Sequence, residues 1–478
     1  MKIDTDESGF SQGPSVDDPP VVIAELNYDA GLSVDSDKVA GLEDSNSRTQ
    51  LIGILNRYSR RVKPRFKVSS PNRKLRMARC VNELDDITPD KRAAYVQAGF
   101  LEIESVPGYE KELLDALAQA SSIWKATSAP QPVPASLDIH PSDVLTGRTP
   151  GSRNFEPAQG YLHAAPWGID AGAAWEHDGG RGKNIKVCDI ESNWLRSHED
   201  LPAGIPMIGG QFLKDEHWRN HGTAVLGLLA AQPGQTGVHG ICPEAQCLVQ
   251  SGYYRSGFNT SRALASATDE LEAGDIVLIE MQARGPTRRY IPMQWWDDVY
   301  SAVLTAVEKG ILVVAASGNG GVDFETAAFA DSNVQKDSGA LLVGAGIPPT
   351  NIYDVGHAYD LIGTPRSAMP FSNYGNEVRI HAWGWHVTSL GYGDAQGGGK
   401  QRWATLRFSG TSSAAAIVAG AAACLQGIAK SRFQQVMRPD RLRHLLVDSG
   451  TPQTGDAHIG PQPDLRKAIQ KLIVEGPD

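Results

Sequence analysis

The sequence predicts an α/β fold in which a parallel sheet is covered by helices on both faces, preceded by a small α+β domain. Three observations predict it. From about residue 155, apolar runs rich in β-branched residues alternate with helical patterns and glycine turns, as in strands buried on both faces. Residues 21–128 carry shorter strand and helix patterns, and a proline-rich stretch separates the two regions.

Composition limits the classes of protein that this chain can belong to. At 478 residues it exceeds what one hydrophobic core usually serves, so we expect two or three domains. The apolar share of 41% and charged share of 21% are those of a soluble globular protein. Its 45 basic and 55 acidic residues give a net charge of −10, which argues against nucleic-acid and membrane partners. We also expect no signal peptide and no apolar run long enough to span a bilayer.

The cysteines indicate the redox compartment. Five of them are scattered along the chain, an odd number without the spacing of a disulfide framework. Cys242 and Cys247 could pair in an oxidising compartment, but two free thiols are the favoured interpretation. Together with the expectation of no signal peptide, this predicts a cytoplasmic protein.

The N-terminal part divides into three segments. Residues 1–20 are rich in Asp, Ser, Gly and Pro and are predicted to be disordered. Residues 21–128 are predicted to form the α+β domain, and residues 129–155 a proline-rich linker. Within the domain, apolar periodicity predicts, in order, a strand over 21–26, a helix over 47–59, a strand over 66–68, a helix over 88–98, a strand over 101–106, a helix over 109–120 and a strand over 123–126.

Residues 156–478 carry the pattern of the parallel sheet. Buried strands are predicted over 185–189, 275–280, 310–316 and 341–345. In open parallel sheets, functional groups collect at the carboxyl ends of the strands. Asp189 ends the first of these strands and Asn319 follows the third, so both are candidates for one site.

A candidate nucleophile lies in Ser409-Gly410-Thr411-Ser412-Ser413, where a glycine turn precedes a helix of small and apolar residues. A serine hydroxyl is a weak nucleophile until a base accepts its proton, and the unpaired N–H groups of a helix start can hold an oxyanion. Such a segment can equally be a packing element. The functional interpretation therefore requires a base, an orienting acid and an oxyanion donor elsewhere.

The candidate base is His221, in Asn220-His221-Gly222-Thr223, which we expect in the first turn of a helix. His198 is interpreted as a structural histidine. Asp189, His221 and Ser412 then follow one another as acid, base and nucleophile, with Asn319 as a fourth polar group.

Residues from about 156 to 470 resemble a subtilisin-family (subtilase) serine peptidase. Four motifs match in the family's order: the strand end at 187–189, residues 220–223, residues 316–320 and residues 409–414. The resemblance implies a subtilisin-like three-layer, doubly wound parallel sheet and hydrolysis of peptide bonds in proteins or peptides. It also implies that the N-terminal region is a ferredoxin-like prodomain, which acts as an intramolecular inhibitor.

The resemblance implies a role for each matching residue. Ser412 attacks the peptide carbonyl, His221 takes and returns the proton, and Asp189 orients the imidazole. Asn319 and the Ser412 backbone N–H stabilise the oxyanion. The wall of the first specificity pocket is formed by Ala316, Ser317 and Gly318. This chemistry needs no metal and no cofactor, and we expect neither.

The chain departs from the family pattern in three places, one of which is Ala416, where a proline commonly follows the nucleophile. Asp189-Ile190-Glu191 stands where the family has Asp-Ser/Thr-Gly. The segment Glu280-Met281-Gln282-Ala283 stands where a small Ser-x-Gly lines the substrate cleft, so Glu280, Met281 and Gln282 are candidate substrate-binding residues. A Glu280 carboxylate facing the pocket would favour substrates with Lys or Arg, and the alternative is that this side chain turns away.

Two other functions remain open at this point. The chain could be a catalytically silent subtilase fold that serves as a binding protein. It could also be a narrow regulatory peptidase that cuts one partner protein and is held latent by its N-terminal domain. If that domain is an inhibitory prodomain, we expect self-cleavage between residues 125 and 155, dependent on Ser412.

Overall fold

The structure of the chain, a computed structural model, describes residues 21–26, 33–35, 38–40, 54, 57, 59–64, 100–105, 110–119, 124–128, 130–136, 153–349 and 363–478. They belong to two compact units, one of residues 1–131 with 254–258 and one of residues 132–253 with 259–478. The predicted disorder of residues 1–20, the strand over 66–68 and the helix over 88–98 lie outside the described residues.

The first unit contains a four-stranded antiparallel sheet of order β4-β5-β1-β6. Its elements are β1 (Val21–Leu26), β4 (Ser59–Pro64), β5 (Phe100–Ser105), α4 (Glu110–Gln119) and β6 (Trp124–Ser128), with a separate hairpin of β2 (Ser33–Asp35) and β3 (Lys38–Ala40). Leu113 and Leu117 of α4 are buried, as is Ile103 of β5. The strands predicted over 21–26, 101–106 and 123–126 and the helix over 109–120 are confirmed.

Between β1 and β4 the structure differs from the prediction. Residues 54 and 57 are helical, as expected, but β4 begins at Ser59, where the helix was predicted to end. The strand order is that of a βαββαβ unit. The ferredoxin-like assignment stays a prediction, because most residues that would form its first helix lie outside the described part.

The second unit is built on a seven-stranded sheet whose neighbouring strands pair in parallel, in the order β18-β17-β16-β13-β8-β10-β9. The strands are β8 (Lys186–Glu191), β9 (Met207–Gly209), β10 (Gln246–Ser251), β13 (Ile276–Ile279), β16 (Leu312–Ala316), β17 (Leu341–Gly346) and β18 (Val378–Trp383). All residues of β13, β16 and β17 are buried, which matches their apolar sequences. The predicted three-layer α/β sheet is confirmed.

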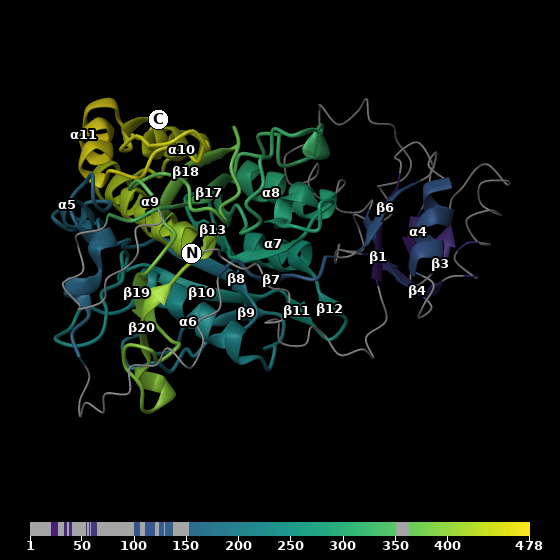
Figure 1. Ribbon diagram of the computed structural model, residues 1–478, viewed down its shortest axis with the longest axis horizontal. Helices are drawn as coiled ribbons and strands as arrows, with labels where there is room; N and C mark the ends of the chain where they lie inside the picture. The colour runs from purple at the N-terminus through teal and green to yellow at the C-terminus, as the bar shows by residue number, and fades with distance from the viewer. Residues whose placement is uncertain are drawn as a thin grey trace. The chain divides into compact units, whose positions relative to one another are not determined.

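Helices pack on this sheet in two groups, which can be followed in Figure 1. In one group α9 contacts α6, α5, α10 and α11 as well as strands β13, β16, β17 and β18; in the other, α7 contacts α8 and β8, and α8 contacts β16. The helices are α5 (Ala171–Trp175), α6 (Glu216–Ala230), α7 (Thr260–Glu270), α8 (Asp297–Glu308), α9 (Thr411–Phe433), α10 (Pro439–Ser449) and α11 (Leu465–Glu475).

Helix α9 corrects one expectation. By length and composition alone it could cross a membrane, although the sequence was expected to hold no such run. The apolar window that meets this criterion is entirely buried in the protein, so α9 is a core helix. Its run of alanine and glycine lets sheet strands and α6 approach closely from several directions.

Shorter elements complete the second unit. They include a three-stranded sheet of order β15-β14-β7. The elements are β7 (Val133–Pro134), η5 (Glu156–Ala158), η6 (Gly160–Leu162), β14 (Met281–Arg284), β15 (Tyr290–Pro292), η7 (Met293–Trp295), η8 (Ala327–Phe329), β19 (Val387–Leu390), η9 (Lys400–Arg402) and β20 (Ala404–Phe408). The two-stranded sheet of β11 (Tyr253–Tyr254) and β12 (Gly257–Phe258) contains residues 254–258, which are assigned to the first unit. Part of the expected linker is thus a strand, β7, and its Pro134 is tolerated because β7 lies at an edge.

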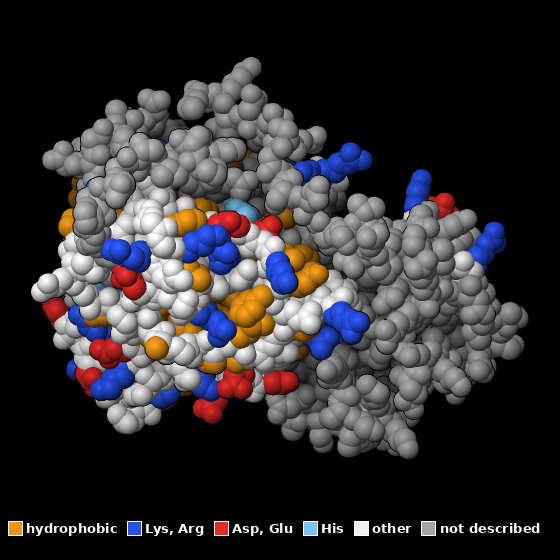
Figure 2. Space-filling view, turned by 90° about the horizontal axis from the view of Figure 1, so that it is seen from below, with side chains coloured by type: hydrophobic (Ala, Val, Ile, Leu, Met, Phe, Trp, Pro, Cys, Tyr) orange, Lys and Arg blue, Asp and Glu red, His pale blue; other side chains and the backbone are white. Residues whose placement is uncertain are grey.

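Surface charge and cysteines agree with the composition. Figure 2 shows basic, acidic and apolar side chains interspersed on the described face of the molecule. Four cysteines, Cys188, Cys242, Cys247 and Cys424, are buried and unpaired, as the free-thiol interpretation expects. Cys80 lies outside the described residues.

Candidate active site

Ser412 lies in the first turn of α9, where the sequence predicts it, and it is fully buried. The turn before it depends on Gly410, whose φ of +111° is one that residues with a Cβ rarely adopt. A Cβ at this position would also clash with the carbonyl oxygen of Ala135. Glycine is therefore required both by the backbone conformation and by the close approach of a second segment.

His221 lies in the second turn of α6 rather than in the first turn. The helix begins at Glu216, because the side chain of Asp215 caps it by accepting a hydrogen bond from the Trp218 N–H at 2.9 Å. The imidazole is buried and forms a T-shaped contact with the Phe408 ring, with the ring centroids 5.3 Å apart. His221 Nδ1 lies 2.9 Å from Oε2 of Glu191.

The structure thus places Glu191, not the expected Asp189, beside His221. The carboxylate of Asp189 instead accepts a hydrogen bond of 2.7 Å from the Trp194 indole. The predicted strand ended at Asp189, but β8 continues to Glu191. Residues two apart on a strand share a face, so extending the strand brings the second acid to its carboxyl end. Glu191, which belongs to the segment that departs from the family pattern, is therefore the acid in contact with His221.

Burial controls the protonation of these groups. It raises the pKa of Asp189 to about 8, against a smaller opposing effect of the Trp194 hydrogen bond. Burial also raises the pKa of Glu191 well above its usual value, and the charges of Asp189 and Glu280 raise it further. For His221, burial lowers the pKa well below its usual value and nearby His217 adds to that shift. These shifts favour the neutral forms of the Asp189 and Glu191 carboxyls and of the His221 imidazole.

Asn319 follows β16 and is held by Thr411. Its Oδ1 accepts hydrogen bonds from the Thr411 backbone N–H at 3.0 Å and from the Thr411 hydroxyl at 2.9 Å. The Nδ2 group is buried and has no hydrogen-bond partner. A buried donor without a partner is costly to maintain, and here it is free to bind an incoming oxygen.

Asn373 holds the loop that carries Asn319, a role that the sequence did not predict. Its Nδ2 donates to the Ser317 carbonyl at 2.6 Å, and its Oδ1 accepts from the Gly320 and Val322 N–H groups, each at 3.1 Å. One amide therefore connects both ends of the turn around Asn319. The available signal was an asparagine in the turn-forming segment Ser372-Asn373-Tyr374-Gly375, between β17 and β18.

A segment of the chain itself lies against β14 and Ser412. Strand β7 pairs antiparallel with β14, with Pro134 opposite Met281 and Val133 opposite Gln282. The Ala135 N–H donates to the Glu280 carbonyl at 3.0 Å, and the Ser412 N–H donates to the Ala135 carbonyl at 3.0 Å. An extended peptide is thus bound by strand addition, with one of its carbonyl groups on the N–H of the candidate nucleophile.

The remaining predicted residues fall into two sets. Glu280 and Gln282 contact the bound segment and Met281 lies opposite it, but the Glu280 side chain is fully buried rather than open to a pocket. The carboxyl of Glu280 lies beside the Ser412 hydroxyl, which partly offsets the rise of its pKa caused by burial and by Asp189. At the end of β16, Ala316, Ser317 and Gly318 lie next to Asn319, and their role as a pocket wall stays a prediction.

The proton path from Ser412 to His221 is not formed in this state. The Ser412 hydroxyl donates to the main-chain carbonyl of Glu280 at 3.4 Å, and His221 Nε2 has no hydrogen-bond partner. A rotation of the hydroxyl would be needed for His221 to accept its proton. Catalytic hydrogen bonds often become well aligned only in the reacting complex.

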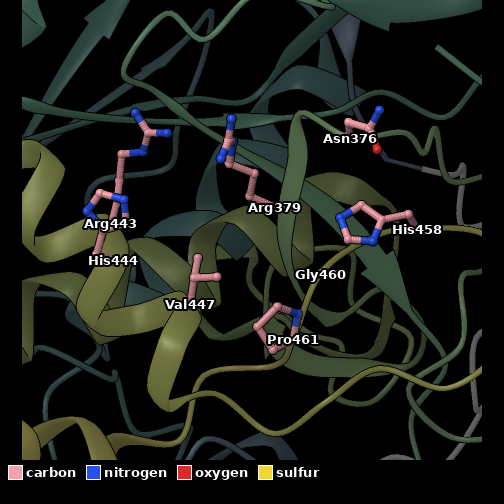
Figure 3. Close-up of a pocket in the computed structure, with 8 residues that line it drawn as sticks. All are labelled: Asn376, Arg379, Arg443, His444, Val447, His458, Gly460 and Pro461. Atoms are coloured by element: carbon pink, nitrogen blue, oxygen red, sulfur yellow. The ribbon is translucent and has the colours of Figure 1, made fainter. Parts of the chain in front are cut away.

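A cavity of about 180 Å³ lies elsewhere in this unit and is shown in Figure 3. Its two arginines are compensated by acids: Arg443 pairs with both carboxylate oxygens of Asp337, and Arg379 with Glu377 at 2.9 Å. Among the described residues, no group of three or more His, Cys, Asp or Glu side chains is placed to hold a metal ion.

Comparison with known proteins agrees with this fold. The model of the subtilase family (Peptidase S8) matches residues 182–462, and the chain therefore belongs to the subtilase family, whose relatives here are serine peptidases. It is 30% identical over 293 residues to the "Intracellular serine protease" of Paenibacillus polymyxa, covering 59% of this chain and 78% of that protein. It is 27% identical to the "Major intracellular serine protease" of Bacillus subtilis, covering 57% and 78%.

Solved structures show the same fold at low sequence identity. The leader-peptide-processing serine protease EpiP from Staphylococcus aureus superposes with a TM-score of 0.55 at 14% identity, over 95% of this chain and 98% of that one. Fervidolysin from Fervidobacterium pennivorans superposes with a TM-score of 0.53 at 17% identity, over 96% of this chain and 62% of that one. These likenesses concern the fold alone.

Proposed function

We propose that this chain is a serine endopeptidase whose catalytic groups are Ser412, His221 and Glu191. Asn319 Nδ2 and the Ser412 N–H are the oxyanion donors. Glu191 takes the role that the sequence assigned to Asp189, because its carboxyl is the one in contact with the imidazole. Asp189 has no catalytic role in this proposal, and its carboxyl is held by the hydrogen bond from Trp194.

The residues support a two-stage reaction. Ser412 Oγ forms a bond to the carbonyl carbon while its proton passes to His221 Nε2, and Glu191 stabilises the resulting imidazolium. The negative charge on the carbonyl oxygen is held by the two oxyanion donors. His221 then returns the proton to the leaving amine as the C–N bond breaks. Water, activated by the same histidine, hydrolyses the acyl-enzyme and restores the Ser412 hydroxyl.

The observation that carries the proposal is the hydrogen bond from the Ser412 N–H to the Ala135 carbonyl. A peptide bound by strand addition, with one carbonyl on an oxyanion donor, has the geometry of a substrate. We infer that the Ala135–Ser136 bond is the first bond cut, and that residues 133–135 afterwards block the cleft. The region before it would then be the inhibitory, ferredoxin-like prodomain.

Labelling and hydrolysis test the proposal together. A fluorophosphonate probe should label the wild type, and the peptide Gln-Pro-Val-Pro-Ala-Ser-Leu, taken from residues 131–137, should be cut after alanine. Ser412→Ala should lose both activities, and His221→Ala should lose hydrolysis while remaining folded by circular dichroism. A wild type that neither reacts with the probe nor cuts any peptide would leave the silent binding protein as the better assignment.

The occupied cleft also favours a narrow regulatory peptidase over a broadly degrading one. A peptidase whose site is covered by its own chain stays latent until that segment leaves. Comparing new protein N-termini in lysate treated with the wild type or with Ser412→Ala would distinguish them. One or a few cleaved proteins support the narrow function, and hundreds of cleaved proteins contradict it.

A cytoplasmic location is part of this proposal. Four buried thiols remain unpaired, as is usual in a reducing compartment. Two of the relatives are named as intracellular proteases. Fractionation of cells that produce the protein would test the location, and recovery in the culture medium would contradict it.

A further inference from the structure

Gln282 connects the bound segment to the loop that carries the oxyanion donor. It lies in β14 with 2% of its surface exposed. Its Nε2 donates to the Pro134 carbonyl at 3.0 Å, and its Oε1 accepts from the Asn319 backbone N–H at 2.7 Å. One buried amide therefore uses its donor on the peptide in the cleft and its acceptor on Asn319.

Both partners lie next to the reacting bond. The Pro134 carbonyl belongs to the peptide bond that immediately precedes Ala135, whose own carbonyl rests on the Ser412 N–H. Asn319 carries the unpartnered Nδ2 that is the second oxyanion donor beside the Ser412 N–H. The Oδ1 of the same amide is fixed by the Thr411 N–H. The position of Gln282 corresponds to the glycine of the family's Ser-x-Gly pattern, and a glycine has no side chain to make this connection.

We propose that Gln282 is a positioning residue that recognises the main-chain carbonyl one residue before the cleaved position and holds the Asn319 loop when that carbonyl is bound. The inference rests on the proposed peptidase function. Without a bound peptide the Nε2 donor loses its partner, and a buried donor without a partner is unfavourable. Because the contact is to the main chain, it favours any extended peptide, whichever side chain stands at that position.

Replacing one atom of the substrate tests the contact directly. Two peptides of the sequence Gln-Pro-Val-Pro-Ala-Ser-Leu are compared, one natural and one with a thioamide sulfur in place of the oxygen on the carbonyl of its second proline. Sulfur is the weaker hydrogen-bond acceptor, so wild type should lose about tenfold in kcat/KM on the thioamide, as expected for one hydrogen bond. Gln282→Met keeps the length of the side chain but has no amide. It should cut the natural peptide about tenfold more slowly and show a thioamide ratio near one.

A matched glutamine provides the control. Gln426 of α9 is buried and likewise connects two backbone groups, donating to the Met437 carbonyl at 2.8 Å and accepting from the Met437 N–H at 2.9 Å. Gln426→Met removes an equivalent amide away from the cleft. It should lower the melting temperature while keeping the wild-type thioamide ratio, which separates a general loss of stability from loss of the substrate contact.

The outcomes separate this inference from the proposed function. An unchanged thioamide ratio in Gln282→Met overturns the role of Gln282 while peptide hydrolysis by the wild type still stands. No hydrolysis by the wild type overturns the proposed function itself. If Gln282→Met does not fold, the test uses the wild type alone. Its loss in kcat/KM on the peptide with a thioamide at the second proline is compared with its loss on a peptide with a thioamide at the N-terminal glutamine. Equal losses at the two positions overturn the inference, and a larger loss at the second proline supports it.

Discussion

Nδ1 of His221 lies 2.9 Å from Oε2 of Glu191, while Asp189, two residues earlier on the same strand, bonds to Trp194. Both acids point to one face of β8, and their positions along the strand separate them. Asp189 lies inside the sheet, opposite Leu278 of β13 and Val249 of β10, whereas Glu191 is the last residue of β8. His221, the base on α6, therefore lies beside Glu191, the acid at the end of β8.

The roles of the two acids can be separated by amide substitutions. Glu191→Gln should lower kcat by about 10⁴-fold, because a neutral amide cannot stabilise the imidazolium or fix its tautomer. Asp189→Asn keeps an acceptor for the Trp194 indole and should retain kcat within about tenfold. Steady-state hydrolysis of one peptide by both variants is the measurement. The opposite order of losses would restore Asp189 as the acid of the triad.

Asn319→Ala should lower kcat by about 10²–10³-fold, the usual effect of removing one oxyanion donor, with little change in KM. The reason is that Nδ2 has no partner in the ground state and gains one only when charge develops on the carbonyl oxygen. Thr411→Val, which removes one of the two bonds to Asn319 Oδ1, should give a smaller loss in the same parameter. A change confined to KM in Asn319→Ala would remove this residue from the oxyanion site.

Much of the architecture was predictable from the sequence. Strands buried on both faces leave continuous apolar runs, so β13, β16 and β17 were found, and the glycine turn before Ser412 was recognisable because its φ requires glycine. The start of α6 was predicted at Asn220 instead of Glu216 because the capping function of Asp215 was overlooked. The acid of the triad was misassigned because Ile190 is an apolar residue between two acids, so the sequence pattern does not distinguish a strand that ends at Asp189 from one that ends at Glu191.

Other features could not be predicted, because they depend on contacts between segments far apart in the chain. Strand β7 was interpreted as linker, since prolines usually interrupt sheets, and its partner β14 lies about 150 residues away. The bridge made by Gln282 and the bracing of the Asn319 loop by Asn373 likewise join separate segments. No local pattern carries such information.

The raised pKa of Asp189 makes stability depend on pH. A carboxyl with a pKa of about 8 in the folded state stays protonated after the unfolded chain has lost its proton, so its contribution is complete below about pH 4 and is lost as the pH rises toward 8. In a Ser412→Ala background, Asp189→Asn should therefore flatten the fall of the melting temperature across this range. The exposed Asp178→Asn serves as the control and should leave the slope unchanged. An equal slope in the Asp189→Asn protein would contradict the raised pKa.

Glu280 should influence the pH profile and not the preference for basic residues. Its buried carboxyl lies beside Ser412, and its charge raises the pKa of Glu191. Glu280→Gln removes that charge, so Glu191 stays ionised to lower pH and the acid limb of kcat should move to lower pH. A peptide library should show the same preference for Lys and Arg in both proteins. A lost preference for basic residues together with an unmoved acid limb would instead support a pocket-facing carboxylate.

The central claim is that the Ala135–Ser136 bond lies in the cleft as a substrate of Ser412. Its most direct test is the intact mass and N-terminal sequence of freshly purified wild type and Ser412→Ala. The account predicts a wild-type fragment that begins at Ser136, while Ser412→Ala remains full length. A wild type that stays full length and yet cuts peptides, or that is cut at another bond, would contradict it.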